Sequence, residues 1–145
     1  MLDMILAATR EGIIGYGNSM PWHSANDFAF FKMMTLHGTV IMGNNTFKGI
    51  VASVGKPLPK RDHLVITRQP QDPSLVQYKN VAYTDDFYIT PTFHRYSCWI
   101  CGGAQVYEYY LKNYRNCIAN IYLTEVGCSI PPPKNGERVL SLIHI

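Results

Sequence analysis

The sequence has 145 residues, a length typical of one domain with one hydrophobic core. Its formal net charge of +3 is small and scattered, which argues against a nucleic-acid-binding protein but suits an anionic small ligand. The N-terminus has neither a basic leader nor a small-residue cleavage site, and no segment approaches the length of a membrane span. We therefore expect a soluble cytoplasmic protein.

The N-terminal part predicts a strand, a long loop and a helix. Residues 4–8 (MILAA) form an apolar run, and residues 9–22 follow as a glycine-containing loop. Ser24 can cap the next helix, in which Phe28, Phe31 and Met34 recur at helical spacing. Loops of this kind often carry function, so this region is a candidate part of a binding site.

One acid, Asp27, lies in this apolar helical stretch, and two interpretations of it stay open. Ser24 and Asp27 form an S-x-x-D pattern, in which the acid only caps the helix start. Alternatively, Phe28 and Phe31 give the carboxyl apolar surroundings, which would raise its pKa and make it a proton donor or a ligand anchor.

The rest of the chain alternates short apolar runs with helical segments. Residues 38–50 predict a buried strand, a turn at Gly43 and a helix that starts near Thr46. Residues 63–69 and 80–86 predict two more strands, residues 96–114 repeat the strand, glycine turn and helix order, and residues 118–126 predict another strand. This order indicates an α/β fold with a mainly parallel central sheet flanked by helices.

In such sheets, ligands bind beyond the carboxyl ends of the strands. Four segments should meet there: the loop before Trp22, residues 43–46, residues 67–68 and residues 102–105. The two glycine turns could present backbone N–H groups to phosphates, although turns needed only for folding would look the same. Arg68 could pair with a phosphate and Arg61 with a carboxylate, or either could be a solvated charge.

Cysteine and histidine positions do not indicate a metal site or a disulfide. Cys98 and Cys101 have C-x-x-C spacing, but on a strand they would point to opposite faces and lie about 10 Å apart. We therefore expect these two cysteines, with Cys117 and Cys128, to be buried reduced thiols. The five histidines show no metal-ligand spacing, so no metal is expected.

Five ordered motifs make residues 4–126 resemble the dihydrofolate reductase family. They are GIIGYGNSMPW (12–22), NDFAFFK (26–32), TVIMGNNTF (39–47), GKPLPKR (55–61) and ICGGAQVY (100–107). The resemblance implies one dihydrofolate-reductase-like domain over residues 1–145. It also implies NADPH-dependent reduction of 7,8-dihydrofolate to tetrahydrofolate, which supports one-carbon metabolism and thymidylate synthesis, by a monomer without nucleic-acid or membrane partners.

The resemblance also implies roles for individual residues. Asp27 would hold the pterin and promote its protonation, Thr124 would bond this carboxylate, and Met20 and Trp22 would close the loop over the reacting rings. The implied substrate-binding positions are Ile5, Ala7, Asp27, Phe28, Phe31, Ile50, Leu58, Arg61 and Thr124. The implied cofactor-binding positions, which include a Gly102–Gly103 peptide that is cis in the family, are Ala7, Ile14, Gly43, Asn44, Asn45, Thr46, Thr67, Arg68, Cys101, Gly102, Gly103, Ala104, Gln105, Val106 and Tyr107.

The sequence departs from the family pattern in two places. Asn44 and Gln105 stand where relatives often carry arginines that meet the cofactor phosphates, which leaves Arg68 to read the 2′-phosphate. Residues 127–145 do not match the family's last two strands; residues 138–145 could form one replacement strand, or the ending is truncated or altered. Losing those strands would expose a sheet edge and a core face.

Two other functions are compatible with parts of the pattern. A related pyrimidine reductase of flavin synthesis resembles the chain in fold and in the glycine pair, although the MPW and NDFAFFK segments disfavour it. An inactive fold that only binds folate or nucleotide, or a fragment that does not fold alone, is favoured by the unmatched C-terminal residues.

Overall fold

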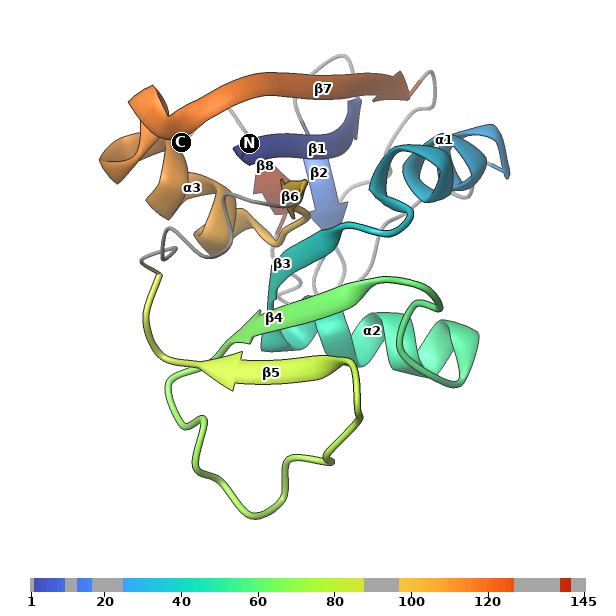
Figure 1. Ribbon diagram of the computed structural model, residues 1–145. Helices are drawn as coiled ribbons and strands as arrows, with labels where there is room; N and C mark the ends of the chain where they lie inside the picture. The colour runs from blue at the N-terminus through green and yellow to red at the C-terminus, as the bar shows by residue number, and fades with distance from the viewer. Residues whose placement is uncertain (1, 10–12, 17–24, 88–96, 127–138, 142–145) are drawn as a thin grey trace.

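A computed structural model describes residues 2–9, 13–16, 25–87, 97–126 and 139–141. The main sheet contains β1 (Leu2–Thr9), β3 (Thr39–Gly43), β4 (Asp62–Ile66), β5 (Val81–Thr84), β6 (Cys98–Ile100) and β7 (Ile118–Val126). Its strand order is β5-β4-β3-β6-β1-β7, and every neighbouring pair is parallel. Figure 1 shows β7 and β5 at opposite edges of this sheet. The mainly parallel α/β fold expected from the sequence is confirmed.

Among the described residues, three helices cover the two faces of the sheet: α1 (Ala25–Thr35), α2 (Asn44–Val54) and α3 (Ala104–Asn113), the last followed by the short 3₁₀ helix η2 (Arg115–Cys117). Because side chains alternate along each strand, successive residues of β1 enter different cores. The α3-side core contains Leu2, Met4, Leu6, Ile41, Ile100, Val106, Tyr107 and Tyr110. The α1/α2-side core contains Ile5, Val40, Met42, Phe47, Val65 and Trp99, with Phe31, Ile50 and Leu58 packed against it.

The helix α2 begins at Asn44, two residues before the predicted start near Thr46. Gly43 has an extended backbone (φ −74°, ψ 164°) and is the N-cap, so the turn needs no additional residue between strand and helix. The helix ends at Gly55, whose φ of +88° is left-handed and whose N–H donates to the Val51 carbonyl at 2.7 Å. Because Gly43 both ends β3 and caps α2, this strand and this helix join directly at the carboxyl edge of the sheet.

The C-terminal strand lies outside the main sheet. Strand β8 (Val139–Ser141) pairs antiparallel with β2 (Ile13–Tyr16), with Tyr16 opposite Val139. Part of residues 138–145 thus forms a strand, but it does not extend the main sheet. In the part of the chain that the structure describes, β7 pairs with β1 alone.

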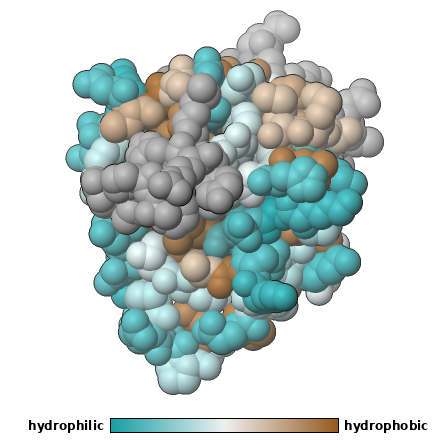
Figure 2. Space-filling model, in the orientation of Figure 1, coloured by the Kyte–Doolittle hydropathy of each residue, from teal (hydrophilic) through white to brown (hydrophobic). Residues whose placement is uncertain are grey.

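Strand β7, at the edge of the sheet, exposes large apolar side chains: Ile121 is 53% and Leu123 is 58% exposed. These residues lie beside Met4 and Leu6 of β1, which are buried under α3. The face shown in Figure 2 is mostly hydrophilic in its lower part and has apolar residues grouped at the upper right. Within the described ranges, no helix has the length and apolar character needed to cross a membrane.

We predict unequal costs for two Leu→Ala substitutions on these neighbouring strands. Leu6→Ala should lower the free energy of unfolding by about 2–4 kcal/mol because it leaves a cavity, whereas Leu123→Ala should cost less than about 1 kcal/mol. Urea unfolding of both variants measures the difference. An equal cost would mean that the outer face of β7 is covered in solution.

None of the described cysteines forms a disulfide within the described residues, and they are not all buried. Cys98 is buried, Cys101 is half-buried, and Cys117 is exposed, so the expectation of a buried thiol is wrong for Cys117. The reason is that Cys117 ends η2 at the surface and is not part of a strand. Burial raises the pKa of the Cys98 and Cys101 thiols. Cys128 lies outside the described residues.

Candidate functional site

Two glycine turns meet at the carboxyl edge of the sheet. Strand β3 ends at Gly43, and β6 next to it leads into Gly102 and Gly103, which precede α3. The Gly43 N–H donates to the Gly102 carbonyl at 2.9 Å, and the Gly102–Gly103 peptide is cis. A Cβ atom on Gly103 would lie 3.2 Å from the Thr46 hydroxyl oxygen. We call these four residues, Gly43, Thr46, Gly102 and Gly103, the glycine junction.

The N-terminal ends of α2 and α3, which lie at this junction, are suited to binding an anionic group. Gly43 and Gly103 are the N-caps of α2 and α3, neither provides a side-chain cap, and neither helix has an acidic residue in its first turn. Neither the N-cap residues nor acids of the first turns therefore compete with a ligand for the first-turn N–H groups and the positive ends of the helix dipoles. The glycine pair allows a ligand to approach the backbone closely, so the junction can accept a phosphate-bearing cofactor.

The other cofactor positions predicted from the sequence differ in how far their side chains are exposed. Arg68 and Gln105 are exposed, and Val106 and Tyr107 are buried under the sheet. The half-buried positions are Ala7, Asn44, Thr67, Cys101 and Ala104, and Asn45 is exposed. The turns at residues 43–46 and 102–105 are thus brought together, and residues 67–68 follow β4, the strand beside β3.

The predicted apolar substrate positions come together from four elements. Ile5 of β1 is buried, and Phe31 of α1, Ile50 of α2 and Leu58 of the following segment pack against the same α1/α2-side core. Ala7, two residues beyond Ile5, lies beside Thr124 of β7. These side chains can provide an apolar wall for a flat ligand.

Arg61 is held beside this wall and is only 5% exposed. Its Nε donates to the Pro59 carbonyl at 3.1 Å and its Nη1 to the Thr35 hydroxyl at 3.3 Å. Thr35 in turn donates to the Phe31 carbonyl at 2.8 Å, so the arginine is tied to α1. Burial lowers the pKa of Arg61, but a guanidinium remains charged. The alternative that Arg61 is merely solvated is wrong; Arg68, by contrast, is exposed.

One hydrogen bond joins the glycine junction side to the apolar wall. The Tyr107 hydroxyl, from α3, donates to the Ile5 carbonyl at 2.9 Å. Next to it, the Cys101 N–H donates to the Ile41 carbonyl at 2.8 Å and fixes the end of β6 against β3. The two halves of the candidate site therefore adjoin at β1.

Asp27 lies on α1, one turn before Phe31. The side chains of Asp27, Phe28 and Ile14, and the whole of Ser24, Met20 and Trp22, lie outside what the structure describes. The choice between a helix cap and a ligand-binding acid therefore stays a prediction.

Three residues near the site were not singled out from the sequence: Thr35, His63 and Trp99. Thr35 and His63 act through hydrogen bonds to groups brought near by folding, so no local motif signals them. The Trp99 indole N–H is buried and has no hydrogen-bond partner among the residues that the structure describes, which a sequence pattern cannot indicate. Trp99 packs on Tyr122 with ring centroids 5.5 Å apart, in the α1/α2-side core.

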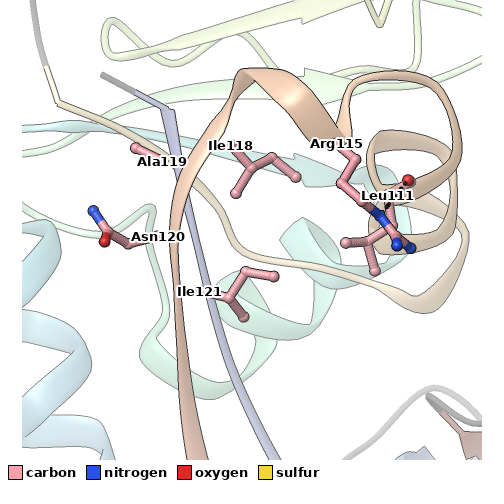
Figure 3. Close-up of a pocket in the computed structure, with 6 residues that line it drawn as sticks. All are labelled: Leu111, Arg115, Ile118, Ala119, Asn120 and Ile121. Atoms are coloured by element: carbon pink, nitrogen blue, oxygen red, sulfur yellow. Dashed lines mark hydrogen bonds between the residues drawn. The ribbon is translucent and has the colours of Figure 1, made fainter.

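A separate open pocket of about 430 Å³ lies away from the glycine junction (Figure 3). Its lining comes from the end of α3, η2 and the start of β7, and consists of Leu111, Arg115, Ile118, Ala119, Asn120 and Ile121. The start of β7 is at the amino edge of the sheet, so this pocket is not the predicted site. Among the described residues, no cluster of three or more His, Cys, Asp or Glu could hold a metal ion.

Comparison with known proteins gives consistent matches. A family model described as dihydrofolate reductase matches residues 1–133. A dihydrofolate reductase of Haemophilus influenzae is 34% identical over 126 residues, which cover 86% of this chain and 71% of that protein. One of Bacillus subtilis is 36% identical over 107 residues, 74% of this chain and 60% of that protein. One of Neisseria gonorrhoeae is 52% identical over 66 residues, 45% of this chain and 39% of that protein.

The alignments cover only part of the length of each of these relatives. The aligned part spans less than two thirds of the Bacillus and Neisseria proteins and slightly more than two thirds of the Haemophilus one. None of these matches supports the pyrimidine reductase alternative.

Proposed function

The chain belongs to the dihydrofolate reductase family, and on this premise we propose that it catalyses the NADPH-dependent reduction of 7,8-dihydrofolate to 5,6,7,8-tetrahydrofolate. The observation that carries the proposal is the bond from Tyr107 to the Ile5 carbonyl, because it sets the anion-accepting junction beside the apolar wall. A hydride donor and a flat acceptor need such adjacent sites to come into contact.

NADPH is proposed to lie on the glycine junction. The uncapped first turns of α2 and α3 fit its phosphates, and the absence of side chains on Gly102 and Gly103 fits close approach of a ring. Arg68, exposed after β4, is proposed to meet the 2′-phosphate. When bound, NADPH supplies the hydride.

Dihydrofolate is proposed to lie against Ile5, Phe31, Ile50 and Leu58, which exclude water from its rings. Arg61 uses Nε and Nη1 within the protein, so Nη2 and the second hydrogen of Nη1 are the donors that we assign to the glutamate carboxylate. The arginine is held in place before the ligand binds, which reduces the entropy lost on binding.

Asp27 is proposed to bind the polar edge of the pterin through paired hydrogen bonds and to promote protonation of N5 through water. Thr124 is proposed to bond this carboxylate, and Met20 and Trp22 to close over the reacting rings. The cytoplasmic location and the monomeric state also remain proposals.

Two measurements test the proposed function. The purified chain should oxidise NADPH only when dihydrofolate is present, as followed by the loss of NADPH absorbance. Its melting temperature should rise with methotrexate, because a ligand that binds the native state stabilises it. A chain that shows neither turnover nor a shifted melt would contradict the proposal, while a shift without turnover would favour an inactive folate-binding fold.

We predict that Gly103→Ala weakens NADPH binding about tenfold while leaving dihydrofolate binding unchanged. The new Cβ would lie 3.2 Å from the Thr46 hydroxyl and narrow the junction. Titration of each ligand by fluorescence measures both dissociation constants. Gly49→Ala is the matched control, since a Cβ on this α2 residue meets nothing within 4 Å and should slightly stabilise the helix.

A further inference from the structure

His63 on β4 is 2% exposed, and both of its ring nitrogens are engaged. Nε2 lies 3.1 Å from the Leu58 amide nitrogen, and Nδ1 lies 3.2 Å from the Asn80 carbonyl oxygen. An amide N–H can only donate and a carbonyl can only accept, so Nε2 must be unprotonated and Nδ1 must carry the hydrogen. The contacts therefore select one neutral tautomer of the ring.

One partner of His63, Leu58, belongs to the segment that carries two proposed substrate residues. Residues 55–61 connect α2 to β4 and include both Leu58 and Arg61. Asn80 adds a second attachment, because its side-chain amide donates to the Arg61 carbonyl at 2.9 Å and to the Leu58 carbonyl at 3.4 Å. We refer to His63 and Asn80 as the loop clamp, since together they bond Leu58 and Arg61 through their backbones.

We propose that His63 is a positioning residue for the substrate site: its neutral ring, together with Asn80, holds Leu58 and Arg61 in place, and its protonation at acid pH releases them. The inference rests on the proposed function for the identity of the ligand, but the clamp itself consists of contacts within the chain. A charged ring would carry hydrogens on both nitrogens, so the Leu58 N–H would lose its acceptor and face another donor.

The surroundings of His63 favour the neutral ring. Burial is the main cause that lowers the pKa of His63 below its ordinary value of 6.5, and nearby Arg61 lowers it further. The Asn80 carbonyl, Asp62 and the backbone of Arg61 act in the opposite direction without reversing the shift. From α2, the uncharged ring of Phe47 packs edge-on against the His63 ring, with the ring centroids 5.7 Å apart.

The sign of the pH dependence follows from this shift. The unfolded chain takes up a proton on His63 as the pH falls through about 6.5, while the folded chain resists it until a lower pH. The stabilising contribution of the neutral ring is therefore complete above the ordinary pKa and is lost as the pH falls toward the folded pKa. Dihydrofolate affinity should weaken at a lower pH, where the folded ring itself takes up the proton.

Two variants test the proposal. His63→Leu fills similar space without polar atoms and should raise the KM for dihydrofolate about tenfold at neutral pH, with the KM for NADPH unchanged within about twofold. His63→Gln retains an acceptor and a donor but does not titrate. It should keep the dihydrofolate KM within about threefold of wild type at neutral pH and abolish the rise in KM that wild type shows as the pH falls below the ordinary pKa of histidine.

Nitrogen-15 NMR of the ring gives a readout independent of turnover, and wild type should show the Nδ1–H tautomer at neutral pH. An Nε2–H tautomer, an equal rise in both KM values, or an unchanged acid response in His63→Gln would overturn the proposal. If His63→Leu does not fold, the acid response of His63→Gln decides. If the wild type shows no turnover, that result contradicts only the proposed function. The loop clamp is then tested by measuring the methotrexate affinity of the wild type and of the same two variants.

Discussion

Replacing Asp27 with Asn is expected to lower the turnover number for dihydrofolate about 100-fold or more at neutral pH. Asn cannot promote protonation of the pterin, and general acid catalysis typically contributes a factor of this size. The position of Asp27 on α1, one turn before Phe31 of the apolar wall, gives the carboxylate its proposed access to the substrate. Steady-state rates measured across neutral pH, with the melting temperature as a check on folding, provide the test.

The control for this substitution is Asp85→Asn, which changes an exposed acid after β5 and should leave turnover unchanged. The alternative role of Asp27 as a helix cap predicts a different pattern. A capping acid would cost about 1 kcal/mol of stability on substitution and leave the rate as it was. Wild-type turnover in Asp27→Asn, combined with a lowered melting temperature, would therefore assign Asp27 to the cap.

Replacing Arg61 with Ala is expected to raise the KM for dihydrofolate about 100-fold. The substitution removes charge-assisted hydrogen bonds to the glutamate carboxylate, and such bonds contribute about 1.5–3 kcal/mol each. It also removes the bonds from the guanidinium to Thr35 and the Pro59 carbonyl, so the melting temperature should fall. Arg61→Lys retains a charge but not the planar fork, and it should recover only part of the affinity.

Arg68→Ala is a matched comparison for Arg61→Ala, because it removes the same charge from an exposed arginine. Arg68→Ala should weaken NADPH about tenfold more than NADH and leave the dihydrofolate KM unchanged, because only NADPH carries the 2′-phosphate. Separate KM values for the three ligands distinguish the two arginines. An equal effect of both substitutions on dihydrofolate would contradict the assignment of Arg61 to the carboxylate.

The β7 edge shows where local pattern and tertiary context diverge. The apolar residues of 118–126 predicted a strand, and that strand forms. Yet Leu123 is exposed while Leu6 beside it is buried, because α3 covers β1 but not the outer part of β7. Strand propensity comes from the side chains themselves, whereas burial depends on which elements pack over them.

Short apolar runs and glycines were enough to predict the strands and the turns, because they act on the backbone over a few neighbouring positions, and five ordered motifs were enough for the family resemblance. The bond between Gly43 and Gly102, the burial of Arg61 against Thr35 and the contacts of His63 with Leu58 and Asn80 appear only in the folded chain. These contacts join groups that only the folded sheet brings together, and several involve backbone atoms that every residue type shares. Residue identity therefore carries no local signal for them.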